Sequence, residues 1–374
     1  MDKPPQRFSK TVFELTGLVS ISRAVGGDSS FVLGGSGNTS VKTADGRFMY
    51  IKASGTALKN MTAGKGWKRL KLESIYKVLS DRSIARMGAV AREKKVSGRL
   101  LAACDDRFGK DVRPSVESCF HSLLDRAVIH LHPVAVLPYL CAKKGHTELQ
   151  KLFGSDRFPP LWVPFRYFGY SLAKEIEGLI KKYKKQYGRG PAVLFLQNHG
   201  LVVTAGDGDT ALKSFYRTVD ICRRALKQPE MVEVKVPDKQ AIDTVAAVIS
   251  NISRVKGDSA VQHFADTIIM SFMSRKDAAK LCSAAAVTGD ELVYAGGPPM
   301  WLEMNKKIKS GAGMPAGFLV RPLGLFVVGE KKKLSLTKDC LSTYLLVRLF
   351  AADLGGINPL TKQQLKFIAK AGKI

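Results

Sequence analysis

The segment RPSVESCFHSLLDRAVIHLHP, residues 113–133, combines a glutamate with three of the six histidines of the chain. Its second part, AVIHLHP, is an apolar, β-branched run with a two-residue alternation, which predicts a strand. Side chains two positions apart on a strand point to the same face, so His130 and His132 would lie side by side. Because two adjacent imidazoles suit a divalent cation, this spacing predicts part of a metal site.

A carboxylate precedes this strand in the sequence. Pro114 and Ser115 predict the start of a helix, with Ser115 capping its first turn. Glu117 would then lie in that turn, and His121 one turn further on the same side. A carboxylate at a helix start that faces a two-histidine strand would be an acid or base beside a Lewis acid.

A third histidine completes the candidate site, since catalytic zinc takes three protein ligands and keeps an open position. The apolar run AVLFL, residues 192–196, is followed by Gln-Asn-His-Gly and a second apolar run. The glycine would let His199 turn into a cleft at this junction. Taken alone, each histidine is explained as well by packing in a core, and we give that simpler role to His121, on a helix face, and a surface position to His146. For the three others, together with Glu117, we predict a metal site.

Two turns made of glycine and small polar residues lie upstream. The run GGSG, residues 34–37, leads into Asn38-Thr39-Ser40, and the predicted strand 48–51 is followed by Ala53-Ser54-Gly55-Thr56. Backbone and side-chain donors of such turns can close on a phosphate group. The alternative is a pair of ordinary turns between secondary-structure elements, because glycine turns alone are weak evidence.

Five segments of the chain resemble the successive motifs of the class II aldolase/adducin family: GGSGNTSVKT (34–43), IKASGTAL (51–58), RPSVESCFH (113–121), IHLHP (129–133) and LFLQNHGLVV (194–203). The resemblance covers most of residues 15–230. It is closest to the aldolase portion of the bifunctional rhamnulose-1-phosphate aldolase/alcohol dehydrogenases, whose pattern includes GGNTSVKT and PSVE. The order of five motifs makes the resemblance specific, although no single motif would suffice.

The resemblance implies a role for each candidate residue. A divalent metal, expected to be Zn²⁺, would be held by His130, His132 and His199, with Glu117 as the catalytic acid or base. The substrate phosphate would be bound by Asn38, Ser54, Gly55 and Ser115, with Lys42 adding positive charge and Thr39 and Thr56 as further candidates. One departure is Val116, which stands where simpler class II aldolases carry a second serine and so removes one phosphate donor.

The implied reaction is the metal-dependent cleavage of a phosphorylated ketose, of the rhamnulose 1-phosphate type, to dihydroxyacetone phosphate and an aldehyde. A sugar-phosphate 4-epimerase or dehydratase of the same superfamily would use the same metal site. An adducin-like protein would instead keep the fold as an interaction module without catalysis. The presence of all three histidines and of Glu117 argues against that last alternative.

The formal net charge of +27 is the one extreme of the composition. Such a charge attracts anions, and both sugar phosphates and nucleic acids are anions. The basic residues are spread along the chain without interleaved aromatic residues, so we expect a solvated basic surface that steers an anionic substrate, and no nucleic-acid partner. Six scattered cysteines without a C-x-x-C pair predict reduced thiols. No run is long and apolar enough for a membrane span, so we expect a soluble, cytoplasmic protein, and by the resemblance a homo-oligomer, specifically a tetramer.

The length of 374 residues predicts one large or two moderate domains. We predict an α/β fold, with a class II aldolase-like three-layer α/β/α domain over 1–232, a linker near 228–238 and a smaller C-terminal α/β region over 239–374. The segment 317–350 aligns with 192–225 so that Leu323 falls on His199, which predicts a partial, metal-free repeat. No G-x-G-x-x-G follows a strand in that region, so nicotinamide chemistry is not expected there.

Overall fold

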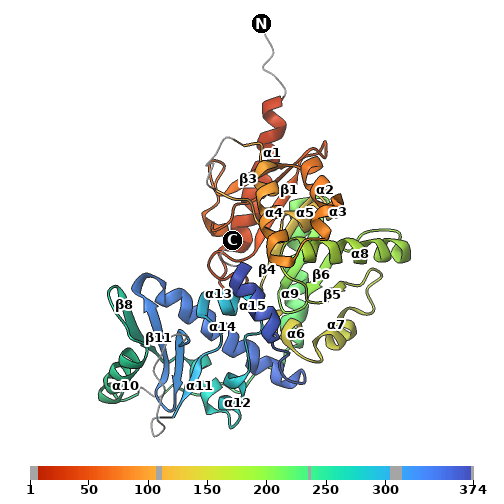
Figure 1. Ribbon diagram of the computed structural model, residues 1–374. Coiled ribbons are helices and arrows are strands. Elements are labelled where there is room, and N and C mark those ends of the chain that lie inside the picture. The colour runs from red at the N-terminus through yellow and green to blue at the C-terminus, as the bar shows by residue number, and fades with distance from the viewer. Residues whose placement is uncertain (1–6, 107–111, 235–236, 304–313, 372–374) are drawn as a thin grey trace. The chain divides into compact units, whose positions relative to one another are not determined.

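A computed structural model describes residues 7–106, 112–234, 237–303 and 314–371 (Figure 1). The chain forms two compact units, of which the first contains residues up to 140, residues 146–225 and the last few residues. The second unit contains residues 226–369 together with the short segment 141–145. Within the described ranges, no helix combines the length and the apolar character that crossing a membrane requires.

The first unit is built on a seven-stranded sheet. In spatial order the strands are β3 (Trp67–Lys71), β2 (Phe48–Lys52), β1 (Asn38–Lys42), β4 (Ala127–Leu131), β7 (Gly200–Ala205), β6 (Val193–Leu196) and β5 (Leu161–Val163). All neighbours are antiparallel except β5 and β6, which are parallel. Strand β4 lies in the middle of the sheet and every one of its residues is buried, which explains why its sequence is a nearly continuous apolar run.

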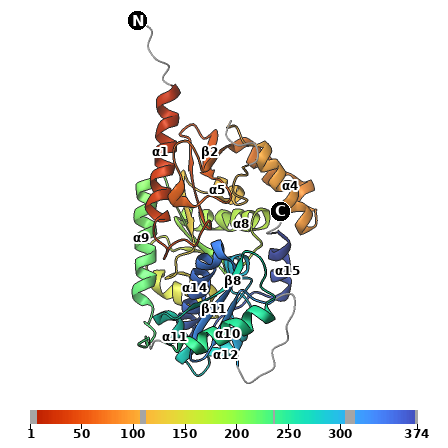
Figure 2. The ribbon, with the colours of Figure 1, turned by 90° about the vertical axis from the view of Figure 1, so that its left-hand side faces the viewer.

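Helices cover both faces of this sheet. Helices α1 (Arg7–Gly26) and α9 (Gly208–Ala225) pack on one face, and Figure 2 shows them together on one side of the unit. The other face carries α2 (Leu72–Ser80), α4 (Ala89–Ala102), α5 (Ser118–Leu123) and α8 (Tyr170–Tyr187). Shorter elements complete the unit: η1 (Leu58–Asn60), α3 (Arg82–Ala85), α6 (Leu137–Cys141) and α7 (Gly145–Phe153). The predicted α/β/α arrangement of three layers is confirmed.

Helix α8 illustrates how the sequence specifies these elements. Its buried residues Leu172, Ile176 and Ile180 recur at the spacing of one helix face, while its lysines lie outside the core. The helix ends where Gly188 adopts a left-handed conformation, with φ of 72°. At its start, the Glu93 carboxylate of α4 accepts the backbone N–H of Tyr170 at 3.1 Å.

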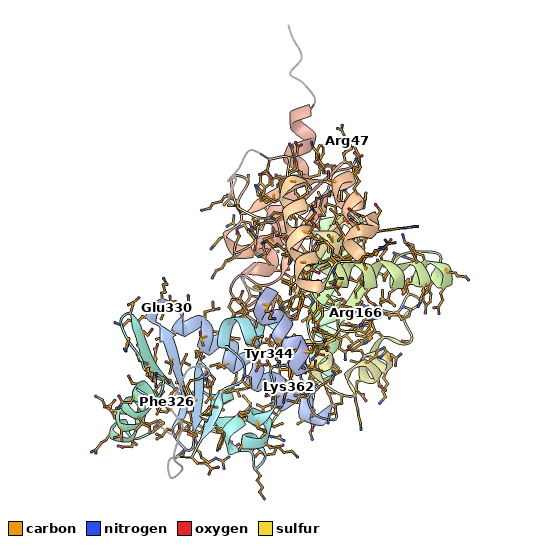
Figure 3. All side chains as sticks on the ribbon, in the orientation of Figure 1. Arg47, Arg166, Phe326, Glu330, Tyr344 and Lys362 are labelled. Carbon is orange, nitrogen blue, oxygen red and sulfur yellow. The ribbon has the colours of Figure 1, made fainter. Side chains whose placement is uncertain are left out.

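The second unit has a four-stranded sheet in the order β8 (Ser259–Phe264), β11 (Gly324–Glu330), β10 (Gly317–Val320) and β9 (Met300–Leu302). Its helices are α10 (Lys239–Ile252), α11 (Thr267–Ser274), α12 (Ala278–Ser283), α13 (Gly289–Ala295), α14 (Leu334–Asp353) and α15 (Lys362–Ala371), with η2 (Lys331–Lys333) before α14. Phe326 of β11 and Tyr344 of α14, both labelled in Figure 3, are fully buried. An ion pair of 2.6 Å joins the buried side chains of Glu291 and Arg348. The smaller C-terminal α/β region is therefore as predicted.

The two sheets share one pattern of strand pairing. In the β6–β7 hairpin, Val193 pairs with Val203 and Leu196 with Gly200; in the β10–β11 hairpin the pairs are 317 with 327 and 320 with 324. The parallel neighbour of each hairpin keeps the same register. Residue 161 of β5 pairs with residue 194 of β6, and residue 300 of β9 pairs with residue 318 of β10. On the other side of each hairpin, residue 130 of β4 lies opposite residue 202 of β7, and residue 263 of β8 lies opposite residue 326 of β11. A constant shift of 124 along the chain therefore relates the two hairpins, as 317 − 193 = 124 and 324 − 200 = 124.

Candidate metal centre

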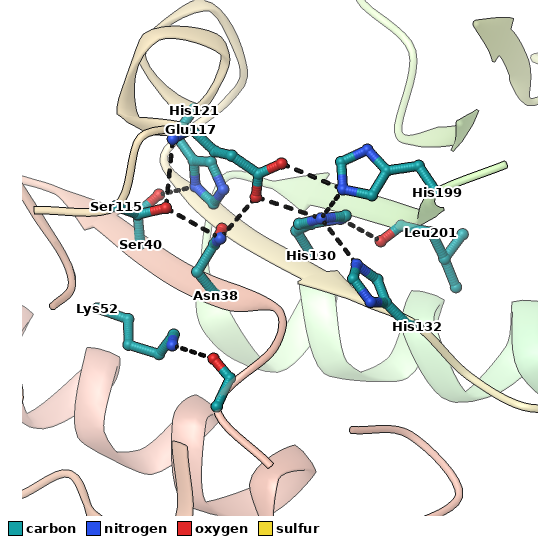
Figure 4. Close-up of polar contacts among 11 residues, drawn as sticks. Asn38, Ser40, Lys52, Ser115, Glu117, His121, His130, His132, His199 and Leu201 are labelled. Carbon is teal, nitrogen blue, oxygen red and sulfur yellow. Dashed lines mark hydrogen bonds and ion pairs between the residues drawn. The ribbon is translucent and has the colours of Figure 1, made fainter. Parts of the chain in front are cut away.

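Two strand ends in the first unit bring three histidines together. His130 lies on β4 and His132 follows it directly, whereas His199 lies in the turn between β6 and β7 (Figure 4). The Nε2 atom of His130 is 3.2 Å from Nε2 of His199 and 3.3 Å from Nε2 of His132. In the described part of the chain, the nitrogen donors of these three histidines lie within 4.8 Å of one another, so the three side chains could hold one metal ion. The structure thus brings together the three histidines that the sequence singled out.

The spacing fits a tetrahedral cation. With metal–nitrogen distances of about 2.0–2.1 Å, the nitrogens at two corners of a tetrahedron are about 3.3–3.4 Å apart. The Nδ1 atom of His130 contacts the carbonyl of Leu201 at 3.0 Å, which fixes the ring with Nε2 toward the other imidazoles. Burial lowers the pKa of His130 well below its usual value, and the adjacent imidazoles lower it further against the opposing effect of Glu117. A neutral imidazole is the form that presents a lone pair to a cation.

Gly200 is required for this close approach. A Cβ atom at this position would lie 2.4 Å from Cδ2 of His132 and 2.6 Å from the carbonyl oxygen of Leu131. Any other residue would push β7 away from β4 where the two strands carry the ligands. The preceding Asn198 adopts a positive φ of 54°, so the turn places His199 beside His130.

Glu117 lies against the same nitrogens. Its Oε1 atom is 3.2 Å from Nε2 of His199, and its Oε2 atom is 3.3 Å from Nε2 of His130. The side chain is buried, and burial alone would raise its pKa. Favourable interactions with the two imidazoles and a hydrogen bond from Asn38 outweigh burial, so the pKa of Glu117 lies well below its usual value. The site thus contains an ionised carboxylate beside the candidate metal ligands.

The predicted local structure around Glu117 was wrong in one respect. Helix α5 begins at Ser118 and not at Ser115, so Glu117 is its N-cap residue and makes no side-chain cap. The reason is that Pro114 is paired with Ala53 in an isolated bridge, which keeps the chain extended up to Ser115. Ser115 nevertheless supports the carboxylate, because its Oγ accepts the backbone N–H of Glu117 at 3.3 Å.

Asn38 connects Glu117 to the predicted phosphate turns. Its Nδ2 atom donates to Oε2 of Glu117 at 2.7 Å and to Oγ of Ser115 at 3.1 Å. Ser54 lies in the adjoining turn, where its N–H donates to the carbonyl of Arg113 at 2.9 Å, and Gly55 has a positive φ of 76° with open space where a Cβ would stand. Asn38 and Ser115 therefore lie beside Glu117, and the turn of Ser54 and Gly55 is joined by its backbone to the segment that leads into Ser115.

Lys52 joins both turns and was missed by the sequence reasoning. It is only 3% exposed, and its Nζ, drawn in Figure 4, donates to a carbonyl 2.7 Å away, that of Gly35. The same Nζ donates to the carbonyl of Thr56 at 2.8 Å. A buried ammonium is costly unless several acceptors surround it, so its presence between two turns is informative. The signal in the sequence was a lysine that directly follows the apolar run FMYI, two residues ahead of Ser54.

Other predicted residues lie elsewhere. Lys42 is at the far end of β1 from Asn38, and its Nζ donates to the carbonyls of Leu124 and Asp125. The Thr39 hydroxyl contacts that of Ser22 on α1 at 2.6 Å, and the Thr56 methyl lies near Gly66. The structure brings none of these three side chains to the group of His130, His132 and His199.

The remaining histidines of the first unit and the rim of the site complete the geometry. His121 is fully buried with Nδ1 2.7 Å from the Ser40 hydroxyl, and burial lowers its pKa to about 3. His146 is exposed and stacks on Trp162, with ring centroids 4.5 Å apart. Phe168 packs on the His199 ring at 4.7 Å between centroids. Val116, next to Glu117 in the sequence, is 48% exposed.

Comparison with known proteins identifies the family of this chain. Residues 16–226, more than half of the chain, match the family described as Class II Aldolase and Adducin N-terminal domain. A curated relative, the uncharacterized oxidoreductase YuxG of Bacillus subtilis (strain 168), is 26% identical over 311 residues, which are 77% of this chain and 42% of the relative. The chain thus spans less than half the length of that relative.

Solved structures of similar fold include the N-terminal class II aldolase domain of a conserved protein from Thermoplasma acidophilum. It is 22% identical with a TM-score of 0.46, covering 60% of this chain and 96% of that one. Another is L-fuculose-1-phosphate aldolase from Thermus thermophilus, which is 16% identical with a TM-score of 0.34, covering 57% of this chain and 91% of that one. The family match over residues 16–226 shows that the chain belongs to the class II aldolase and adducin family.

Proposed function

We propose that this protein is a metal-dependent aldolase that cleaves a phosphorylated ketose, of the rhamnulose 1-phosphate type, into dihydroxyacetone phosphate and an aldehyde. The observation that carries the proposal is the placement of both Glu117 carboxylate oxygens 3.2–3.3 Å from the Nε2 atoms of His199 and His130. A proton acceptor in contact with a three-histidine group is the arrangement that carbon–carbon cleavage next to a carbonyl needs.

His130, His132 and His199 would hold the metal, and we propose Zn²⁺ because three imidazoles suit it and because Nε2 of His130 lies 3.2 Å and 3.3 Å from those of the other two. When bound, such a cation polarises a carbonyl group and stabilises negative charge on its oxygen. The protein contributes the orientation of the three rings, through the Leu201 carbonyl at His130 and the close strand approach at Gly200.

Glu117 would move the proton at the carbon next to the carbonyl. The low pKa of this carboxylate keeps it ionised and ready to accept a proton. Glu117 is buried, and Phe168 packs on the ring of His199, so access of water to the carboxylate is limited. Asn38 keeps the carboxylate pointing toward the imidazoles.

Asn38, Ser54, Gly55 and Ser115 would bind the phosphate, with the Lys52 ammonium holding their two turns in place. Anchoring the phosphate fixes the distant reacting carbon relative to Glu117 and the histidines. The net charge of +27 would also speed the approach of a phosphorylated substrate.

A 4-epimerase or a dehydratase acting on a sugar phosphate remains the alternative, because each also begins at a carbonyl beside a metal. The test is to incubate the zinc-loaded protein with a panel of ketose 1-phosphates and to identify the products by phosphorus and proton NMR. The aldolase proposal expects dihydroxyacetone phosphate with an equal amount of aldehyde. An isomer of the starting sugar or a dehydrated sugar phosphate would support the alternatives.

For the second unit we propose a degenerate copy of strands β4 to β7 that binds no catalytic metal. The shared register supports this, because His263 takes the place of His130 and Ala265 that of His132. Leu323 takes the place of His199, and the His263 ring contacts the Leu323 carbonyl at 2.9 Å. With one of three ligands kept, the second unit would serve stability or assembly and leave the chemistry to the first.

A further inference from the structure

A second cavity of the first unit lies at the opposite end of the strands that carry the histidines. His130 pairs with Val202 near one end of β4 and β7, whereas the pair Ala127–Ala205 marks the other end. There a cavity of about 610 Å³ is lined by Asp125, Lys184, Arg189, Thr204, Gly206 and Ser214, among others. This volume falls within the range of small-molecule sites. Because none of these lining residues belongs to the metal centre or the phosphate turns, the cavity is a separate feature.

Two unpaired cations line this cavity. In the described part of the chain, neither Lys184 nor Arg189 has a carboxylate partner, and Arg189 instead lies 4.7 Å from the ring centroid of Phe158. Two other lysines of the same helix, Lys174 and Lys181, contact Glu177. Asp125 is the one carboxylate among the lining residues, so the cavity carries an excess of positive charge.

A third cation contacts residues that line the cavity. Lys42 extends from β1 and its Nζ donates to the carbonyls of Leu124 and Asp125, which both line the cavity. Burial lowers the pKa of Lys42 to about 8; Asp125 opposes this effect and Lys184 adds to it. An anion bound in the cavity would be attracted by the charge of Lys42 as well as by that of Lys184.

We infer that this cavity binds the phosphoryl group of a small metabolite, with Lys184 and Arg189 as its direct ligands and Lys42 as a supporting charge. Ser214 of α9 adds a hydroxyl donor at the same wall. A phosphoryl dianion matches two cations that line a cavity of this size, and arginine can donate two parallel N–H groups to such an anion.

A simpler role for Lys184 is to complement the negative end of the α8 dipole, because α8 ends at Tyr187. Lys185 is equally placed for that role but does not line the cavity. Lys185, together with the exposed Lys182 of the same helix, therefore provides a control with an identical change of charge.

The test is a titration of the full-length protein with inorganic phosphate, followed by proton–nitrogen correlation NMR, with sodium chloride at equal ionic strength as reference. We expect saturable shifts of the Gly190 and Gly206 amides, which line the cavity. In the double variant Lys184→Gln/Arg189→Gln these shifts should need at least about tenfold more phosphate, because two charged ligands are lost. The control Lys182→Gln/Lys185→Gln should retain the affinity of the unaltered protein.

The absence of saturable shifts at Gly190 and Gly206, or an equal weakening in the control variant, would overturn the inference. Phosphate bound at the metal centre has its own reporter in the Gly55 amide, and Ser115→Ala is expected to weaken only that response. The dispersion of the amide signals shows independently whether the Lys184→Gln/Arg189→Gln protein is folded. The inference about the cavity and the proposal about the metal centre are therefore tested independently.

Discussion

The amide of Asn38 donates to the Glu117 carboxylate at 2.7 Å, and its second N–H donates to Ser115 at 3.1 Å. Both donors of this side chain are thus in use, and its Oδ1 atom is buried without a hydrogen-bond partner among the described residues. If Asn38 also binds the substrate phosphate, it must release one of these contacts. Phosphate binding at Asn38 would then be linked to the orientation and the pKa of Glu117.

Asn38→Ala should shift the pH dependence of catalysis. The hydrogen bond from Asn38 lowers the pKa of Glu117, so its removal raises that pKa toward the value that burial favours. If Glu117 acts as a base, activity is lost as the pH falls through this pKa, and the acidic limb of the kcat profile should move to higher pH. Ser115→Ala should raise KM without moving that limb as far. An acidic limb at the same pH in Asn38→Ala and the parent would contradict the link.

Replacement of His130, His132 or His199 by Ala should each remove most of the bound metal. The reason is that two remaining imidazoles hold a cation far less tightly than three. His146→Ala is the control, because this exposed ring lies outside the group. His121→Ala should keep the metal but lower the free energy of unfolding by about 1–3 kcal/mol, since Ser40 loses a buried partner. Metal analysis and urea unfolding give the two readouts, and full metal occupancy in His199→Ala would rule out the ligand assignment.

Lys52→Met should weaken substrate binding and stability together. The carbonyls of Gly35 and Thr56 lose a charged donor in this variant, which costs about 1.5–3 kcal/mol per bond to a charged group. The two turns would then separate and KM would rise more than kcat falls. Lys59→Met, an exposed lysine of η1, is the matched control. A Lys52→Met protein with normal KM and normal thermal stability would show that the turns are held by other contacts.

Much of the fold followed from the sequence because its signals were local. The alternation around His130 predicted β4, and the apolar runs on both sides of His199 predicted β6 and β7. Helix α8 continues through its lysines to Tyr187, since lysines on an exposed face do not end a helix whereas the left-handed Gly188 does. Boundaries therefore depended on one residue that periodicity does not reveal.

The parts of the site that were missed depend on contacts distant in the sequence. The bond from Asn38 to Glu117 joins residues 79 positions apart, and the bond from Lys52 to Gly35 spans 17 positions. Lys42 was predicted beside the phosphate turns by its motif. It lies instead at the other end of β1, where Val41 pairs with Ala127 while Asn38 pairs with His130. Residues that are neighbours in a short motif can thus lie at opposite ends of one strand.

A chain that ends near Asp238 should keep all metal ligands but aggregate or change its oligomeric state. The segment Cys141–Gly145 belongs to the second unit. There the backbone N–H of Lys143 donates to the carbonyl of Gly356 at 2.9 Å, and the backbone N–H of Asn358 donates to the carbonyl of Cys141 at 2.6 Å. Truncation would leave these backbone groups unpaired and expose the buried Cys141. Light scattering is the measurement, and a soluble, fully active truncated protein with unchanged assembly would show that the second unit is dispensable.

The most direct test compares metal content and dihydroxyacetone phosphate release in Glu117→Gln with those of the parent protein. This substitution keeps the shape of the side chain and one oxygen, but removes the proton acceptor that lies 3.2–3.3 Å from the imidazoles of His199 and His130. We predict one metal ion per chain in both proteins, and release from the best ketose 1-phosphate lowered by about two orders of magnitude or more. Loss of the metal from Glu117→Gln would make Glu117 a ligand, and undiminished release would contradict its role in proton transfer.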